Sequence, residues 1–200
     1  MTEAERALVQ LSAALAAGNA DALAHAIDRA AMLAPAQAEE AILQSYLFVG
    51  YPAALQALAT WRARTGLPAP PGAADDAREW RTRGERVCAT VYGGQYERLR
   101  ENIVALHPDV EEWMLTEGYG KVLGRPGLPL RVRELCIIAL LAAQHAPAQL
   151  YSHVRGAVNA GASAADVDDA IETAARVLPA DRVAALRETW NRVRSRRPGS

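Results

Sequence analysis

The chain has 200 residues, of which 50% are hydrophobic and 22% are charged, and its formal net charge is −1. This length and apolar fraction are enough for a buried core, and they exclude an intrinsically disordered chain. The near balance of charge argues against a general polyanion-binding surface, so we predict no nucleic-acid partner. The arginine-rich segment Arg192–Arg197 is interpreted as a solvated terminus rather than a phosphate-binding patch.

Targeting signals and cysteines indicate the cellular compartment in which the protein is expected. The first ten residues lack the basic start and continuous apolar run of a secretory signal. No stretch of the sequence approaches the roughly 20 apolar residues that a membrane span needs. The two cysteines, Cys88 and Cys136, fall in apolar helical contexts, which is typical of buried thiols in a reducing compartment. We therefore expect a cytoplasmic protein with no membrane partner.

Helical patterns dominate the first part of the chain, and no segment alternates apolar and polar residues as a strand does. The chain begins with an Ala-rich helical pattern, and Gly or Pro residues then mark the breaks between the helices that follow. The predicted helices cover residues 3–17, 21–33 and 37–49, and a fourth runs from the break at 50–52 to residue 64. The predicted fold class is therefore all-α.

A Pro- and Gly-rich segment, residues 65–76, is predicted to be a linker. A long helix is expected over 77–105, relaxed at Gly93-Gly94, and a shorter one over 110–118. The segment 124–129, with sequence GRPGLP, is expected to be a loop.

The segment 131–161 predicts two antiparallel helices joined by a tight break at 144–147. Its first helix is apolar on nearly every face, which is typical of a buried helix. Gly161 is suited to follow a helix C-terminus, and Ser163 with Asp166 has the pattern of a capping box. Further helices are expected from there to Val177 and, after a break at Leu178-Pro179, to about Arg194.

The two halves of the chain follow the same order of helices and breaks. Each closes on a Thr-Trp pair, Thr60-Trp61 and Thr189-Trp190, and these pairs lie 129 positions apart. Further upstream, shifts of 127 and 128 are both acceptable, so either Ala26 or His25 aligns with His153. We predict a tandem of two related helical halves, 1–64 and 77–200, joined by the linker 65–76.

Two polar residues lie on apolar stripes of the 131–161 hairpin, and this position makes them candidates for a site. Glu134 heads a stripe in the first helix, and His153 belongs to a stripe in the second. Counting from a bend near residue 146 places them about 7 Å apart along the helix axes. This register predicts a bridging water or substrate atom between them rather than direct contact.

The stretch from about Tyr92 to Ile171 resembles the carboxymuconolactone decarboxylase family, within the wider AhpD-like all-helical fold. The resemblance rests on an ordered series of short motifs rather than on any one of them. The series comprises His107-Pro108, Trp113, Gly118-Tyr119-Gly120, Arg125-Pro126-Gly127-Leu128, Arg133-Glu134, Leu150, His153, Arg155, Ala157 and Gly161-Ala162-Ser163. Residues 37–60 also resemble the closing segment of the family, with Gly50-Tyr51-Pro52 as its Gly-x-Pro turn. That turn and the Glu/His pair fall in different halves, which suggests that the halves pack together.

The resemblance implies two alternative activities. In the AhpD-like peroxidase branch a Cys-x-x-Cys precedes the histidine, but Ala146 and Gln149 occupy those positions here. Cys136 lies on the preceding helix, so the required disulfide pair cannot be formed without a partner chain. A peroxiredoxin-type oxidoreductase is therefore disfavoured.

The decarboxylase branch needs no cysteine, and its Glu-to-His spacing matches Glu134 and His153. By resemblance, the protein is a lyase of aromatic-compound catabolism that decarboxylates a small carboxylated lactone or keto acid without cofactor or metal. Imidazole exchanges protons near neutral pH, so His153 is the expected general acid/base, and Glu134 orients it or relays its proton. The predicted substrate-binding residues are Arg131, Arg133 and Arg155, which can hold a carboxylate, and Trp113 and Tyr119, which can form an aromatic wall.

Structural alternatives stay open for these residues. His153 can be a satisfied core residue, and Glu134 can simply favour the helix dipole. In the first half, Arg6 or Ala7 falls at the position of Glu134, so no Glu/His pair and no site are expected there, and a role for His25 stays open. The resemblance also implies a homo-oligomer, a dimer, trimer or hexamer. A non-catalytic helical oligomer that kept the fold and lost the chemistry is the remaining alternative.

Overall fold

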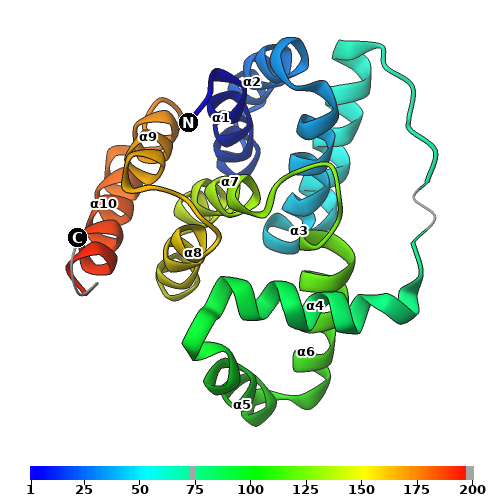
Figure 1. Ribbon diagram of the computed structural model, residues 1–200. Coiled ribbons are helices and arrows are strands. Elements are labelled where there is room, and N and C mark those ends of the chain that lie inside the picture. The colour runs from blue at the N-terminus through cyan, green and yellow to red at the C-terminus, as the bar shows by residue number, and fades with distance from the viewer. Residues whose placement is uncertain (73–74, 197–200) are drawn as a thin grey trace. The chain divides into compact units, whose positions relative to one another are not determined.

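The computed structural model describes residues 1–72 and 75–196, and these residues form helices and no strands (Figure 1). The chain divides into two compact units. The first combines Met1–Ala69 with the chain from Gly127 onward, and the second is Pro70–Pro126. These boundaries differ from the halves 1–64 and 77–200 expected from the sequence, because the chain leaves the first unit and later returns to it.

Helix α7 (Leu130–Gln144) lies in the middle of the first unit (Figure 1). It packs against α1 (Glu3–Ala17), α3 (Pro35–Thr65), α8 (Pro147–Asn159) and α9 (Ala164–Ala174). All eleven residues from Val132 to Ala142 are buried, as expected for a helix that is apolar on nearly every face. Helices α2 (Ala20–Leu33) and α10 (Ala180–Ser195) complete the unit.

Local signals set the ends of several helices. Ser163 and Asp166 form the predicted capping box of α9. The second helix is capped by Asn19, whose side chain accepts a hydrogen bond from the Ala22 amide, two positions before the predicted start. Gly50 interrupts α3 with φ 77 and ψ 167, a conformation that favours glycine, so the predicted break at residues 50–52 is confirmed.

The second unit contains α4 (Ala77–Tyr92), η1 (Gly93–Gln95), α5 (Tyr96–Leu106), α6 (Pro108–Trp113) and the π-helical segment η2 (Met114–Leu123). The expected relaxation at Gly93-Gly94 is present as η1, and the helix expected over 110–118 extends to Leu123.

Close packing of α4 on η2 depends on two glycines. A Cβ atom on Gly84 would lie 1.8 Å from the Leu115 carbonyl oxygen. A Cβ atom on Gly120 would lie 2.1 Å from the Trp80 carbonyl oxygen. Neither position has room for a side chain, because the obstructing atoms are backbone. The Gly118-Tyr119-Gly120 motif therefore has a packing role within this unit.

A search of the described helices for a segment long and apolar enough to cross a membrane finds none.

Candidate functional site

The candidate site lies on the hairpin formed by α7 and α8. His145 ends α7 in the left-handed conformation, with φ 55, and Pro147 occupies the first turn of α8. Proline suits this position because the first amide of a helix has no intrahelical acceptor. The resulting tight bend brings the second turn of α8 and the first turn of α7 together, so that Glu134 and His153 meet.

The two side chains are in direct contact. His153 Nδ1 and Glu134 Oε2 are 2.8 Å apart, a hydrogen bond between residues 19 positions apart in sequence. The predicted separation of about 7 Å with a bridging atom is therefore wrong. That prediction compared backbone positions along the helices and left out the reach of the two side chains. The direct bond leaves Nε2 as the imidazole nitrogen that a ligand can address.

Both members of the pair are buried, but to different degrees. The Glu134 side chain is fully buried, while the His153 side chain keeps 8% of its surface exposed. Glu134 Oε1 is also buried and, among the described residues, has no hydrogen-bond partner. A carboxylate oxygen in that state carries a desolvation cost of at least about 1–3 kcal/mol. A donor that reaches this oxygen would recover part of that cost.

Phe48 of α3 completes the surroundings of the imidazole. Its ring meets the His153 ring edge to face, with centroids 5.8 Å apart and an interplanar angle of 84°. Phe48 is the only phenylalanine of the chain and lies two positions before Gly50. Sequence reasoning did not single it out. The usable signal was the Gly-x-Pro turn in the opposite half from the Glu/His pair, which indicated that this segment approaches the hairpin.

Arg133 is fully buried beside the pair, and its guanidinium is engaged internally. It donates to Glu40 Oε2 at 2.8 Å, to Gln44 Oε1 at 3.2 Å and to the Leu128 carbonyl at 3.2 Å. These contacts connect the first turn of α7 to α3. Arg133 therefore holds the backbone that carries Glu134, rather than extending into an open site.

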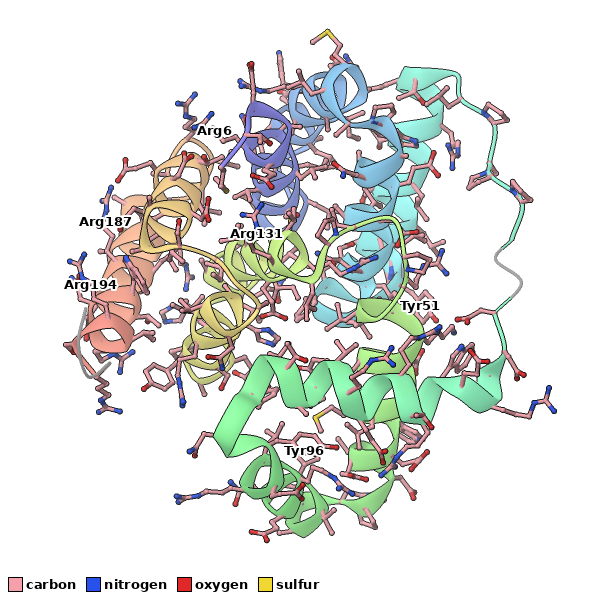
Figure 2. All side chains as sticks on the ribbon, viewed as in Figure 1. Arg6, Tyr51, Tyr96, Arg131, Arg187 and Arg194 are labelled. Carbon is pink, nitrogen blue, oxygen red and sulfur yellow. The ribbon has the colours of Figure 1, made fainter. Side chains whose placement is uncertain are left out.

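The other two predicted arginines lie elsewhere on the hairpin. Arg131, at the start of α7 (Figure 2), pairs with Glu5 and lies 3.4 Å from Asp166. The guanidinium carbon of Arg155 lies 6.0 Å from the ring centroid of Tyr151. Arg155 follows His153 by two helical positions, about 200° around α8, so the two side chains leave opposite sides of the helix.

The two predicted aromatic residues belong to the second unit. Tyr119 is buried, and its ring meets that of Tyr92 edge to face at 6.1 Å. Trp113 is 60% exposed at the end of α6. The structure groups Glu134, His153, Arg131, Arg133 and Arg155 within one unit, and Trp113 and Tyr119 within the other.

The thiols and the remaining histidines have structural positions. Cys136 is completely buried, and burial raises the pKa of its thiol to about 12, so it carries no thiolate at neutral pH. Cys88 is also buried, and neither cysteine forms a disulfide. His107 caps α6 by accepting from the Asp109 amide, and His145 ends α7. His25 lies on the surface of α2, within 2.8 Å of the Asp21 carbonyl.

Metal-ligating side chains do not gather in the described part of the chain. No group of three or more His, Cys, Asp or Glu residues there could hold a metal ion.

The helical units and the buried Glu–His hairpin define an all-α protein of the AhpD-like bundle class. Residues 108–190 match the model of the Carboxymuconolactone decarboxylase family, so the predicted resemblance to this family is confirmed over that segment. The matched segment runs from α6 through α10 and includes Glu134 and His153. A search of curated proteins finds no match for the chain.

Proposed function

We propose that the protein is a cofactor-independent decarboxylase of a small carboxylated lactone or keto acid, with His153 as general acid/base. The direct bond between Glu134 Oε2 and His153 Nδ1 carries this proposal. A carboxylate that engages Nδ1 fixes the orientation of the ring and directs Nε2 toward any bound substrate. A general acid needs this kind of positioned proton donor.

The chemistry follows from the charge that decarboxylation releases. When the bond between carbon and the carboxylate breaks, carbon dioxide leaves, and the electron pair of that bond passes into the conjugated carbonyl. The resulting enolate takes a proton from Nε2 of the imidazolium. The imidazole, still held by Glu134 at Nδ1, then regains a proton from solvent before the next turnover. The partial exposure of His153 supports this exchange.

Low local polarity around the pair favours the reaction. Phe48 covers one side of the imidazole, and the α7 residues that follow Glu134, Leu135–Ala142, are apolar and buried. A carboxylate substrate loses hydration in such surroundings, while the charge-delocalised enolate loses less. The unpartnered Glu134 Oε1 is a further acceptor for a substrate hydroxyl or carboxylic acid group.

A cation must hold the substrate carboxylate, and the proposed cations are Arg131, Arg133 and Arg155. Trp113 and Tyr119 remain the residues proposed to form an aromatic wall. Arg131 shares the first turn of α7 with Glu134, although a substrate would compete there with Glu5 and Asp166. Arg133 contributes through the position of α7, because its own donors bind Glu40, Gln44 and Leu128.

We further propose that the protein is a cytoplasmic homo-oligomer and that its first unit contains a tandem repeat. Two buried thiols without a disulfide fit a reducing compartment. The repeat is supported by two equivalent contacts: the Trp61 indole donates to Glu39 and the Trp190 indole to Asp168, each across 22 residues.

The test is carbon dioxide release from carboxymuconolactone and related lactones of aromatic catabolism, using the full purified chain. The wild type should turn over at least one of them. His153→Ala should lower kcat by at least about a hundredfold while keeping the melting temperature within a few degrees, since general acid catalysis contributes about 10²–10⁴. Glu134→Gln should reduce kcat by a smaller factor, because the amide still accepts or donates at Nδ1.

Matched controls separate catalysis from folding and from thiol chemistry. His25→Ala removes a surface imidazole and should leave turnover unchanged. Cys136→Ala and treatment of both cysteines with a thiol reagent should also leave it unchanged. If no lactone releases carbon dioxide, the decarboxylase proposal is wrong and a non-catalytic helical oligomer is the better account. A parallel loss of melting temperature and activity in His153→Ala would assign the histidine to the core.

A further inference from the structure

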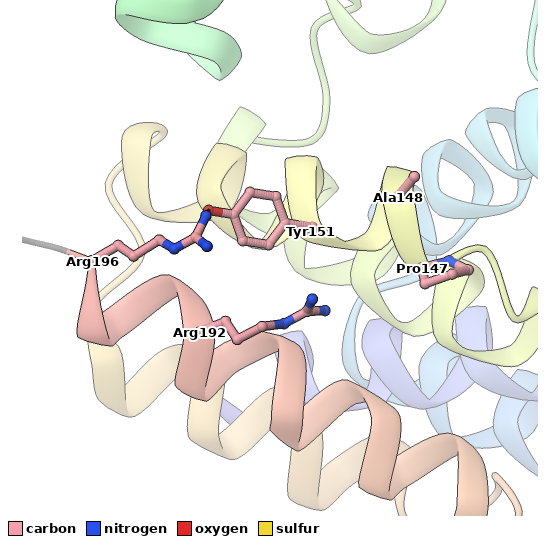
Figure 3. A pocket seen from close by; sticks show the side chains of 5 residues that line it. All are labelled: Pro147, Ala148, Tyr151, Arg192 and Arg196. Atoms are coloured by element: carbon pink, nitrogen blue, oxygen red, sulfur yellow. The ribbon is translucent and has the colours of Figure 1, made fainter.

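Three arginines surround one tyrosine where α10 packs on α8. The guanidinium carbons of Arg155, Arg192 and Arg196 lie 6.0, 5.8 and 5.9 Å from the ring centroid of Tyr151. Arg196 also donates to the Tyr151 hydroxyl at 3.3 Å. Figure 3 shows Arg196 reaching that hydroxyl and Arg192 extending from α10 toward the first turn of α8. Arg192 lies within α10 and Arg196 directly follows it, and both are exposed, as expected for a solvated segment. Arg197, the last member of that segment, lies outside the described residues.

None of the three arginines forms an ion pair with an acidic side chain in the described ranges. This sets them apart from other arginines of the same unit, such as Arg187, which lies on the same helix and binds Glu172 at 2.7 Å. The ring of Tyr151 offsets part of the positive charge, because guanidinium groups are attracted to the face of an aromatic ring. Three positive charges gathered around one ring nevertheless repel one another, because like charges at short range raise the electrostatic energy.

The cluster opens on a depression of about 380 Å³ that no acidic residue lines. Its lining consists of Pro147, Ala148, Tyr151, Arg192 and Arg196 (Figure 3). This volume falls in the range of about 300–1,000 Å³ that small-molecule sites occupy. Pro147 and Ala148 form the first turn of α8, where the helix dipole adds positive potential.

The depression is separate from the Glu–His site. Tyr151 precedes His153 by two positions on α8, so the two side chains leave the helix about 200° apart. Tyr151 is partly exposed next to α10, while His153 is buried against α7 and α3. A ligand at one position therefore does not contact the other.

We infer that this depression binds a small polyvalent oxyanion, a phosphate or an organic polycarboxylate. Planar guanidinium groups bind such oxyanions with paired, charge-assisted hydrogen bonds, and a bound oxyanion would remove the repulsion within the cluster. A nucleic acid is disfavoured as the ligand, because the chain has a net charge of −1 and the arginines gather at one depression rather than along a groove.

Isothermal titration calorimetry of the full chain with inorganic phosphate and with citrate, at matched ionic strength in chloride, tests the inference. The two anions distinguish the two sources of the ligand: tighter phosphate binding indicates a phosphorylated ligand, and tighter citrate binding a polycarboxylate. Saturable binding of either anion with one site per chain is the expected result. No saturable binding of either at concentrations up to about 10 mM would overturn it, because that limit corresponds to about 3 kcal/mol.

Variants localise the site. Arg192→Gln and Arg196→Gln should each weaken binding by about tenfold or more, the loss expected for one charged hydrogen bond. Arg187→Gln is the matched control, because it removes the same charge from the same helix and should leave the affinity unchanged. Equal weakening by all three variants would show only a general charge effect and overturn the inference.

Two further measurements separate this site from other kinds of binding. The inference also fails if a single-stranded oligonucleotide binds more tightly than both anions and Arg192→Gln abolishes that binding. Lactone turnover should be unchanged in Arg192→Gln, which separates this site from the proposed decarboxylase site.

Discussion

The hairpin α1–α2 and the hairpin α7–α8 share a framework but differ in the polar pair. Helices α1 and α7 begin at Glu3 and Leu130, and α2 and α8 at Ala20 and Pro147, both 127 positions apart. This common shift places Ala7 and Ala26 at the positions of Glu134 and His153. Both alanines are fully buried. A hairpin of this kind therefore packs without a buried acid and imidazole, which supports a functional rather than a structural origin for the pair in α7–α8.

A reciprocal pair of arginines also connects the two halves that the sequence predicts. Arg6 of α1 binds Asp169 of α9 at 2.9 Å, and Arg133 of α7 binds Glu40 of α3 at 2.8 Å. Each arginine thus reaches an acid in the other half. The environments differ, because the Arg6 side chain is 40% exposed and that of Arg133 is fully buried. The same contact is thus a surface bridge on one side and part of the core on the other.

The largest effect is expected from copying the acid into the first hairpin. Ala7→Glu adds an unpartnered carboxylate and extra volume to a buried position, and should lower the free energy of unfolding by on the order of 5 kcal/mol. The double variant Ala7→Glu/Ala26→His should be more stable than the sum of its single variants by about 1–3 kcal/mol, if the two positions face each other as Glu134 and His153 do. Urea denaturation of the four proteins of this cycle measures both values. An additive double variant would show that the first hairpin has a different register.

The reciprocal arginines predict unequal losses. Arg133→Ala removes a fully buried guanidinium together with its bonds to the partly buried Glu40 and the buried Gln44, and should cost about 3–5 kcal/mol. Arg6→Ala breaks a partly exposed bridge and should cost at most about 1 kcal/mol. Denaturant midpoints of the two variants at equal salt provide the comparison. Similar losses for both would contradict the view that Arg133 anchors the first turn of α7.

The next effect concerns pH, and it distinguishes Cys136 from Val9, which lies 127 positions earlier in α1. Burial raises the pKa of the Cys136 thiol from 9.0 to about 12. Above pH 9 the unfolded thiol ionises while the folded thiol keeps its proton, so the stability that this group contributes is present below pH 9 and is lost as the pH rises toward 12. Over this range the free energy of unfolding falls by at most about 1.4 kcal/mol per pH unit.

Thermal unfolding of the wild type and Cys136→Ala between pH 8 and 11 measures this pH-dependent loss of stability. Val9 has no ionisable group, and the variant makes α7 resemble α1 in that respect. The stability advantage of the wild type should shrink steadily above pH 9, while Cys88 affects both proteins equally. A constant difference across this range would contradict a buried, protonated thiol.

The features that the sequence predicted well are local. The capping box of Ser163 and Asp166, the break at Gly50 and the bend at residues 144–147 each depend on residues within one or two helical turns, so short patterns specify them. Membership of the Glu134 and His153 side chains in the core also followed from helical periodicity.

The features that the sequence did not predict depend on contacts between distant segments. Phe48 reaches His153 across 105 residues, and Arg133 reaches Glu40 across 93, which periodicity within one helix does not encode. The compact units depend on contacts of the same kind. A linker composition shows where the chain leaves a unit, but not that it returns at Gly127. The direct Glu134–His153 bond required side-chain reach, which a count of helical rise leaves out.

The smallest effects are expected at the two tryptophans near the ends of the predicted halves. Here we expect equal losses of stability in the two halves rather than different ones. Trp61 donates to Glu39 at 3.0 Å and Trp190 to Asp168 at 2.7 Å, and both rings are buried. Trp61→Phe and Trp190→Phe each remove one hydrogen bond to a carboxylate together with a similar part of the ring, so each should cost about 1–3 kcal/mol. Chemical denaturation should give losses within about 0.5 kcal/mol of each other if the proposed tandem repeat makes the two contacts equivalent. A difference much larger than that would mean that the closing segments of the two halves are not equivalent, and would weaken the alignment that pairs Ala7 and Ala26 with the Glu–His site.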